Sequence, residues 1–180
     1  MPGGRIDLER PFQPLGIAVL TISDSRDLAS DTSGDLLAGR IASAGHELRA
    51  RALVRHDKAA IQQQVRRFID DPAVDVVITN GGTGLSARDV APEAVRELFE
   101  RELEGFTVLW HLISYETVGV STLQSRACAG LAGATAIYVL PGSNGACRDG
   151  WDLLISRQLD SRHRPCSIIE VMPRFKARPD

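Results

Sequence analysis

The sequence of 180 residues lacks any run of 18 or more apolar residues, so it offers no candidate for a helix that crosses a membrane. Its first residues, Met1–Arg5, carry no apolar segment of the kind that signal peptides have. We therefore expect a cytosolic protein with no membrane association. Cysteines are also few: Cys128, Cys147 and Cys166 lie far apart and form no Cys-x-x-Cys pair. This spacing favours reduced thiols over disulfides or a zinc site.

Lysine is scarce, since Lys58 and Lys176 are the only lysines among the 21 basic residues. The net charge of −2 argues against a nucleic-acid-binding domain, for which a clustered basic surface is typical, so we expect no nucleic-acid partner. The excess of arginine over lysine fits planar recognition of phosphate and carboxylate groups. A coding bias in the source genome would produce the same excess and is the simpler explanation, so composition alone does not indicate a binding role for the arginines.

The chain alternates strand-like and helix-like segments, which predicts one α/β domain, a three-layer α/β/α sandwich with a mostly parallel sheet. Its length and its 43% hydrophobic content suit a single core. We expect the domain to span residues 15–166, with loose or subunit-contacting tails at 1–14 and 167–180. The expected strands are 15–23, 47–54, 74–79 and 136–140, and the expected helices follow Asp31, Asp57, Pro92, Phe106 and Pro141.

The segment that follows the strand at 74–79 has the composition of a phosphate-handling loop. Gly81, Gly82 and Gly84 remove the Cβ atoms that would keep backbone N–H groups away from an anion, and they allow positive φ angles. Asp89 comes shortly afterwards. A carboxylate beside an anion repels it, so this order indicates a divalent cation, Mg²⁺ in the usual case, that joins the two. An ordinary glycine-rich turn between a strand and a helix is the alternative on glycines alone.

Several short motifs occur in a fixed order along the chain, all of them within the stretch Leu15–Cys166. They are Leu20–Arg26, Asp31–Gly34, Val76–Asp89, Glu104–Phe106, Ser121–Ala127 and Pro141–Ser143. In this order they resemble the signature of the MoaB/MogA family of molybdenum-cofactor biosynthesis proteins. The segments Leu85–Ala87 and Pro141–Gly145 resemble the MoaB branch of that family more closely than the MogA branch.

The resemblance implies a compact α/β fold that assembles as a homotrimer or a homohexamer. It also implies a reaction, in which molybdopterin is adenylylated by ATP with Mg²⁺ and pyrophosphate is released. A partner protein of the same pathway then inserts molybdate. A non-catalytic oligomer that binds molybdopterin or a nucleotide is the alternative within the same pathway.

The resemblance also implies roles for individual residues. Asp57 and Asp89 match the two functional aspartates of the family, and Asp89 is expected to hold Mg²⁺. For Asp57, a helix N-cap is an equally good interpretation of the local sequence. Because the carboxyl ends of parallel strands meet at one sheet edge, we expect the binding residues to converge there. These are Ser23, Asp24, Thr79, Gly81, Gly82, Thr83, Gly84, Ser125, Arg126, Pro141, Gly142 and Ser143.

Overall fold

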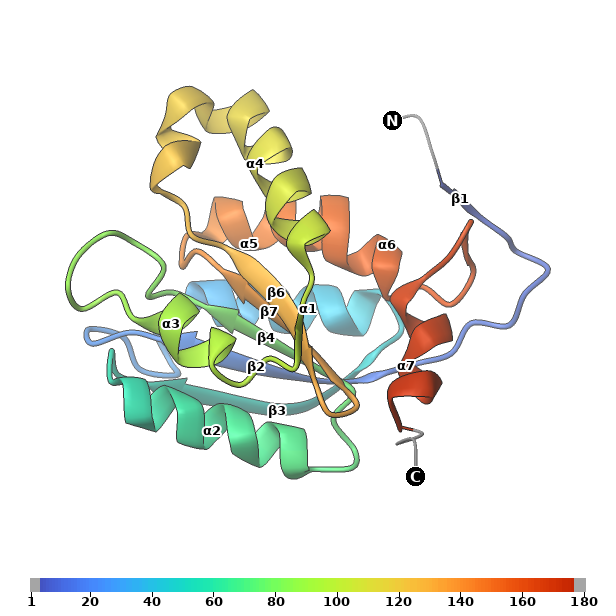
Figure 1. Cartoon of the computed structure of the whole chain (residues 1–180), viewed down its shortest axis with the longest axis horizontal. Coiled ribbons are helices and arrows are strands. Elements are labelled where there is room, and N and C mark those ends of the chain that lie inside the picture. The colour runs from blue at the N-terminus through green and yellow to red at the C-terminus, as the bar shows by residue number, and fades with distance from the viewer. Residues whose placement is uncertain (1–3, 177–180) are drawn as a thin grey trace.

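A six-stranded sheet lies between two layers of helices in the computed structural model, which describes residues 4–176 (Figure 1). The strand order is β3-β2-β4-β7-β6-β5, with β2, β3, β4 and β7 parallel and with β6 and β5 antiparallel to their neighbours. The predicted three-layer α/β fold is therefore confirmed. The strands of this sheet are β2 (Gly16–Ile22), β3 (Glu47–Val54), β4 (Val76–Asn80), β5 (Arg101–Glu102), β6 (Cys128–Ala132) and β7 (Thr135–Leu140).

The helices cover both faces of the sheet. One face carries α1 (Thr32–Ser43), α4 (Glu104–Val118), α5 (Asn144–Gly150) and α7 (Ile168–Lys176), and the other carries α2 (Lys58–Asp70) and α3 (Ala91–Arg96). A 3₁₀ segment, η1 (Gly119–Gln124), follows α4, while a π-helical turn, η2 (Trp151–Ile155), and α6 (Ser156–Gln158) continue α5. Within residues 4–176, none of these helices is long and apolar enough to span a bilayer.

The central strands form the core because they are apolar on both sides. In β2, Ile17 and Val19 belong to the core on the side of α1, while Ala18 and Leu20 belong to the core on the side of α2. All four side chains are fully buried. Buried parallel strands read as continuous apolar runs for this reason, and that is why β2 and β4 were predictable from the sequence.

The hairpin partner of β7 was not predicted. Strand β6 lies between β7 and β5, and the short β5 begins at Arg101, which was expected to be the last residue of the helix that starts at Pro92. That helix ends at Arg96 because the backbone beyond it pairs with β6, where Glu100 N donates to Leu131 O at 2.8 Å. A Cβ atom at Gly130 would lie 2.4 Å from the ring of Phe99, so this strand needs small residues. Small residues carry little of the β-branched signal that marks a strand in the sequence.

The described parts of both tails pack against the domain. Strand β1 (Arg5–Ile6) pairs with β8 (His163–Arg164) in a second, two-stranded sheet. Arg10 binds Glu170 and the carbonyl oxygen of Ser161. Three side chains of α7 are buried in the core, so the domain extends beyond the expected boundary at residue 166. They are Ile168, Ile169 and Met172.

All three cysteines are free thiols. Burial raises the pKa of Cys128 to about 11 and that of Cys147 to about 12, so neither thiol ionises at neutral pH. Cys166 is exposed. The two buried thiols are therefore packing residues, not nucleophiles.

His46 makes the stability of the fold depend on pH. Its side chain is 6% exposed, and its Nδ1 accepts a hydrogen bond from Leu15 N at 3.2 Å. Burial lowers the pKa of His46, and the charge of Asp160 opposes that shift in part. As pH falls below about 6.5, His46 therefore becomes protonated in the unfolded chain but stays neutral in the folded chain. The free energy of unfolding should fall over this range, until pH reaches the lowered pKa of the folded state.

We expect His46→Asn to remove this component of the pH dependence. Urea unfolding at about pH 7.5 and about pH 5.5 would measure it, with a limiting slope of about 1.4 kcal/mol per pH unit for one proton. Asn retains an acceptor for Leu15 N but does not titrate. An equal loss of stability in the wild type and in His46→Asn over this range would contradict the assignment.

Candidate functional site

A cleft of about 520 Å³ opens at the carboxyl ends of β2, β4 and β7. The helix that follows β2 packs on one face of the sheet and the helix that follows β3 packs on the other, so the chain changes direction beside β2. Open α/β sheets bind ligands at such points. The cleft is lined by Thr21, Ile22, Ser23, Ser25, Arg26, His56, Asn80, Gly81, Gly82, Thr83, Gly84, Leu85, Asp89, Gln124, Ser125, Pro141 and Gly142.

The glycine loop after β4 is seated between the ends of the neighbouring strands. Gly81 has a φ of +95° and Gly82 a φ of +68°. A Cβ atom at Gly81 would lie 2.2 Å from the carbonyl oxygen of Ile22, so only glycine fits there. Gly81 N donates to Leu140 O at 3.0 Å, so this N–H group is not available to a ligand. The N–H groups of Gly82 and Thr83 donate to no other residue within 4–176, which leaves them available to an anion.

Asp89 brings a negative charge to this loop. Its Oδ2 accepts hydrogen bonds from the Ser86 hydroxyl at 2.6 Å and from Ser86 N at 3.1 Å. The Ser86 hydroxyl is the main cause that lowers the pKa of Asp89, so the carboxylate is ionised at neutral pH. A Cβ atom at Gly84 would lie 2.7 Å from Asp89 Oδ2, and the absence of a side chain at Gly84 is what lets the carboxylate approach the loop.

The donor groups around Asp89 fit Mg²⁺. This ion is held in phosphate-handling sites by one or two carboxylates, and phosphate and water oxygens complete its coordination. Among residues 4–176, no group of three or more His, Cys, Asp and Glu side chains is placed to hold a metal ion by itself. One ionised carboxylate beside open N–H groups therefore suits a cation that is shared with a phosphate.

Arg126 is bound to the glycine loop. Its Nε donates to the carbonyl oxygens of Gly84 at 3.0 Å and Thr83 at 3.3 Å. Its two Nη atoms contact the carbonyl oxygen of Asp89 and the carboxylate of Glu93. The guanidinium is thus neutralised by a protein carboxylate and engaged with the backbone that carries Asp89.

The other motif residues differ in how they meet the cleft. Ser125 lines it, and its Oγ accepts a hydrogen bond from Trp110 Nε1 at 2.8 Å. Pro141 and Gly142 also line it. Ser143 instead caps α5 by accepting from Ala146 N at 3.1 Å, and it faces a separate hollow beside α4.

At the first strand end, Ser23 lines the cleft, whereas Asp24 lies beside it. Asp24 accepts a hydrogen bond from His56 N at 3.2 Å and pairs with Arg88. The side chain of Thr79 is fully buried inside β4, and within residues 4–176 its Oγ1 has no hydrogen-bond partner. Thr79 therefore supports the cleft from the core side and does not line it.

Asp57 is not among the residues that line the cleft. Its Oδ1 accepts a hydrogen bond from Ala60 N at 2.7 Å and so caps α2, and its side chain lines a separate shallow hollow on that helix. The preceding residue, His56, does line the cleft, and its Nδ1 lies 3.8 Å from Asp89 Oδ1. The N-cap interpretation of Asp57 is therefore confirmed, and the structure does not bring Asp57 and Asp89 together in the lining.

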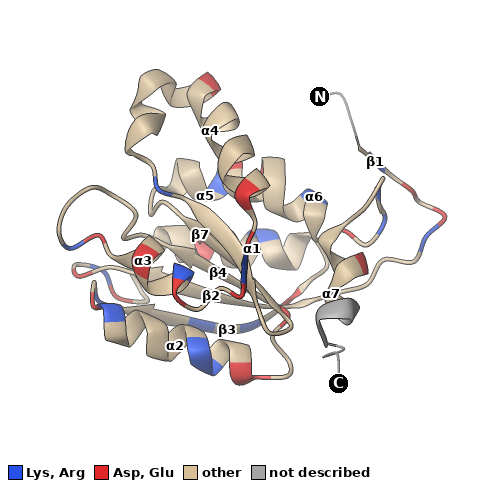
Figure 2. Ribbon diagram, in the orientation of Figure 1, with Lys and Arg blue, Asp and Glu red and all other residues tan. Residues whose placement is uncertain are grey.

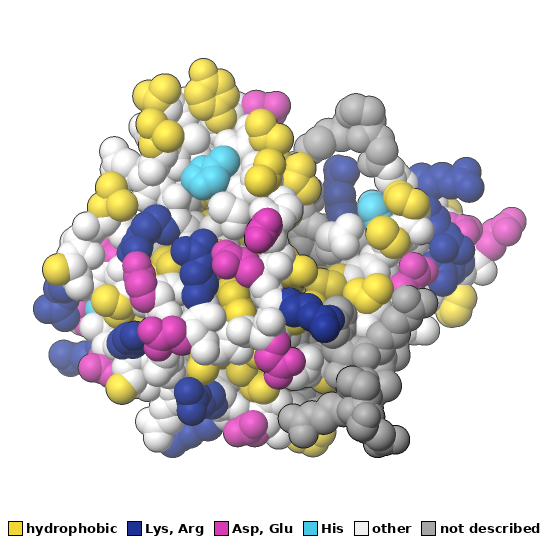
Figure 3. Space-filling model, in the orientation of Figure 1, with side chains coloured by type: hydrophobic (Ala, Val, Ile, Leu, Met, Phe, Trp, Pro, Cys, Tyr) yellow, Lys and Arg dark blue, Asp and Glu magenta, His cyan; other side chains and the backbone are white. Residues whose placement is uncertain are grey.

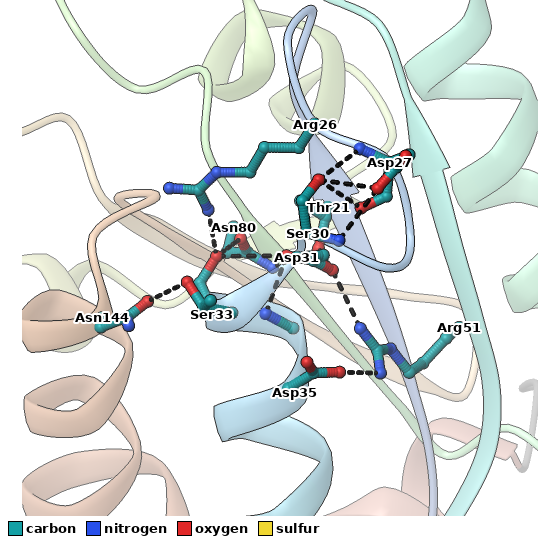
Figure 4. Close-up of polar contacts among 12 residues, drawn as sticks. Thr21, Arg26, Asp27, Ser30, Asp31, Ser33, Asp35, Arg51, Asn80 and Asn144 are labelled. Carbon is teal, nitrogen blue, oxygen red and sulfur yellow. Dashed lines mark hydrogen bonds and ion pairs between the residues drawn. The ribbon is translucent and has the colours of Figure 1, made fainter.

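Several residues of the cleft lining were not among the expected site residues, and three of them are His56, Arg26 and Asn80. Asn80 is fully buried at the end of β4, where it joins a polar network under the cleft (Figure 4). Its position directly after a buried strand was the available signal. Arg26 ends the Leu20–Arg26 motif, but neither Arg26 nor His56 was expected to bind a ligand, because a single arginine or histidine on a loop is most often a surface residue.

Comparisons with known proteins match nearly the whole chain. The sequence model of a probable molybdopterin binding domain matches residues 18–161. The chain is 47% identical over 156 residues to molybdenum cofactor biosynthesis protein B of Escherichia coli K12, covering 87% of this chain and 92% of that protein. A crystal structure of a molybdenum cofactor biosynthesis protein B is similar with a TM-score of 0.83 at 35% identity, covering 92% of this chain and 98% of that one. The tungsten cofactor synthesizing protein MoaB of Pyrococcus furiosus is similar with a TM-score of 0.76 at 26% identity, covering 92% and 99%.

Proposed function

This chain belongs to the family of molybdenum cofactor biosynthesis proteins with a molybdopterin-binding domain, and on that premise we propose that it adenylylates molybdopterin with ATP and Mg²⁺. In this reaction an oxygen of the terminal phosphate of molybdopterin forms a bond with the α-phosphorus of ATP. The bond from that phosphorus to the β-phosphate oxygen breaks, and pyrophosphate leaves with the bonding electrons. We propose that the adenylated product passes to a molybdate-inserting partner protein.

One observation carries the proposal: the ionised Asp89 carboxylate lies against a glycine loop with open N–H groups, in a cleft at the carboxyl edge of the sheet. The volume of about 520 Å³ is within the range of small-molecule sites. A carboxylate in an anion-binding loop is unfavourable by itself, and a shared cation offsets the repulsion. This arrangement supports a reaction between two phosphates.

The residues of the cleft have little covalent chemistry to do. Phosphoryl transfer is accelerated mainly by aligning the two reactants and by neutralising their charge. The N–H groups of Gly82 and Thr83 are suited to orienting a phosphate, and Asp89 to holding Mg²⁺. When bound, that ion would screen the negative charge of the phosphates.

The test is to incubate the purified protein with molybdopterin, ATP and Mg²⁺ and to measure adenylated molybdopterin and pyrophosphate. We expect both products in equal amounts. Binding of both substrates without any product would instead support a non-catalytic carrier of the same pathway. The position of Asp57 outside the cleft lining favours that second candidate, because Asp89 is then the one carboxylate among the described residues that line the cleft.

We further propose that a second copy of the chain covers the exposed face of α4 and η1, as the family resemblance implies. Figure 3 shows hydrophobic side chains gathered over this part of the molecule, and Figure 2 shows no basic residue on α4. The only charged residues of α4 are Glu104 and Glu116. An apolar surface of this kind is typical of a subunit contact. Its exposed apolar residues are Val108, Leu109, Leu112, Tyr115, Val118, Val120 and Leu123.

We expect Leu112→Glu to dissociate the homo-oligomer, since it buries a charge in the proposed contact. Sedimentation velocity should show a trimer or hexamer for the wild type and a monomer for the variant. Gln63→Glu, on the exposed face of α2, adds the same charge as a control and should not change the mass. A wild-type monomer, or an oligomer unaffected by Leu112→Glu, would contradict this contact.

A further inference from the structure

Arg26 is the arginine of the cleft lining, and it has no carboxylate partner within residues 4–176. It is half-buried on the loop between β2 and α1. Its Nη1 donates to Ser33 Oγ at 2.8 Å, which is its one side-chain hydrogen bond to the described residues. Figure 4 shows the side chain reaching over Ser33 and Asn80. An arginine has five N–H donors, so most of the donors of Arg26 remain open to the cleft.

A buried polar network fixes the position of Ser33, the residue that orients the Arg26 side chain. Ser33 is fully buried in the first turn of α1, and its hydroxyl lies 3.0 Å from Asn80 Oδ1 and 3.3 Å from Asp31 Oδ1. Asn80 Nδ2 in turn donates to Thr21 Oγ1 at 2.9 Å, and Thr21 Oγ1 donates to Asp31 Oδ2 at 2.7 Å. Satisfied buried networks are rigid, so Ser33 presents its hydroxyl to Arg26 in one place.

The charge at the centre of this network is already compensated. Burial alone would raise the pKa of Asp31, but hydrogen bonds from Thr21, Gly34 and Arg51 lower it below its ordinary value. Asp31 caps α1 through Gly34 N at 3.0 Å and pairs with Arg51 at 3.1 Å. Asp31 therefore does not need the charge of Arg26.

Three other arginines near the cleft are paired with carboxylates. Arg126 contacts Glu93 and three backbone carbonyl groups of the glycine loop. Arg88 pairs with Asp24, and its side chain is 70% exposed. Arg51 pairs with Asp31 and Asp35. Binding a phosphate through Arg126 would mean breaking contacts that hold the loop, whereas Arg26 can bind one without losing a carboxylate.

We infer that Arg26 binds a substrate phosphate in the cleft, with Ser33 as its positioning residue, and that Arg126 positions the glycine loop instead. This inference rests on the proposed function, because it takes the ligand to be a phosphate group. A guanidinium matches a phosphate with two parallel hydrogen bonds, which gives both affinity and orientation. The phosphate belongs to ATP or to the pterin, and both offer the same chemistry.

The experiment measures binding of ATP with Mg²⁺, and of molybdopterin, to the full chain by calorimetry. We expect Arg26→Gln to raise the Kd for one of these ligands by about 10-fold to 100-fold, and the affected ligand identifies the phosphate. The Kd of Arg26→Lys should fall between those of the wild type and Arg26→Gln, since lysine keeps the charge but lacks the planar guanidinium. Arg67→Gln, in the last turn of α2, removes the same charge outside the cleft lining and should bind like the wild type.

Two further readouts separate binding from support of the structure. Arg26→Gln should unfold at the wild-type temperature, and its Kd should depend less on salt concentration. Arg126→Gln should lower the unfolding temperature and make residues 81–89 more sensitive to protease. Ser33→Ala should weaken binding in the wild-type background but add nothing to Arg26→Gln, because a positioning residue acts through the group it aims.

The possible outcomes are distinct. If Arg26→Gln binds both ligands like the wild type, the assignment is wrong while the proposed function stands. Equal effects of Arg67→Gln would also overturn it. If the wild type binds neither ATP nor molybdopterin, the proposed function fails and the phosphate assignment fails with it.

Discussion

Asp89→Asn is expected to reduce the rate of molybdopterin adenylylation by about 100-fold to 1,000-fold, the usual loss when a main electrostatic group of an active site is removed. The substitution keeps the size of the side chain and an acceptor for the hydrogen bonds from Ser86, which lie at 2.6 Å and 3.1 Å. It removes the negative charge that we propose holds Mg²⁺ against the phosphates. Single-turnover measurements with saturating substrates would report the chemical step alone.

Asp57→Asn is the matched control, because it removes the same charge from the neighbouring helix start. Asn caps a helix about as well as Asp, so the hydrogen bond to Ala60 N and the stability of α2 should persist. We expect this variant to keep most of the wild-type rate. A large loss of rate with unchanged stability would instead assign Asp57 to catalysis. An unchanged rate in Asp89→Asn would remove Asp89 from the mechanism.

Gly81→Ala is expected to destabilise the protein by at least about 3 kcal/mol and to abolish nucleotide binding. A φ of +95° is unfavourable for alanine by about 1–2 kcal/mol. The new Cβ atom would also lie 2.2 Å from the carbonyl oxygen of Ile22, which is backbone and has no freedom to turn away. Relief of that clash must move the end of β2 or the loop itself, and both line the cleft. Urea unfolding and calorimetry with ATP would measure the two effects.

Two other glycines separate the effect of backbone strain from the effect of the Cβ contact. Gly133 has a φ of +57° and open space around it, so Gly133→Ala should cost only the backbone strain, about 1 kcal/mol. Gly39 is exposed inside α1 with nothing within 4 Å, and Gly39→Ala should stabilise the protein by about 0.5–1 kcal/mol. If Gly81→Ala and Gly133→Ala lose the same stability, the contact with Ile22 is not what requires glycine.

The location of the cleft was predictable because local sequence patterns mark the strands and loops that form it. Continuous apolar runs marked β2 and β4, and parallel strands bring their carboxyl ends to one edge. The glycines that follow β4 and the small groups that follow β7 identified the two loops that now touch, since a Cβ atom at Gly142 would lie 3.0 Å from Gly81 Cα. The sequence patterns were strong here because backbone conformation and burial restrict each residue directly.

Side-chain partners were not predictable in the same way. The local sequence leaves open whether Asp57 caps a helix or faces the cleft, and the hydrogen bond that Ala60 N donates to it, which shows the cap, appears only in the folded structure. Arg126 and Glu93 meet across 33 residues of sequence. Arginine is common on loops, so no local pattern distinguishes one that neutralises a carboxylate from one that is open to a ligand.

The sequence by itself determined the alternation of strands and helices, the glycine loop and the membership of the molybdopterin-binding family, because these depend on local periodicity and on short ordered motifs. Only the tertiary structure decided which charges are compensated. Arg126 is neutralised by Glu93 and engaged with the loop, whereas Arg26 faces the cleft without a carboxylate within residues 4–176. Charge compensation depends on distances between residues far apart in the chain, and those distances exist only once the sheet has brought its strand ends together.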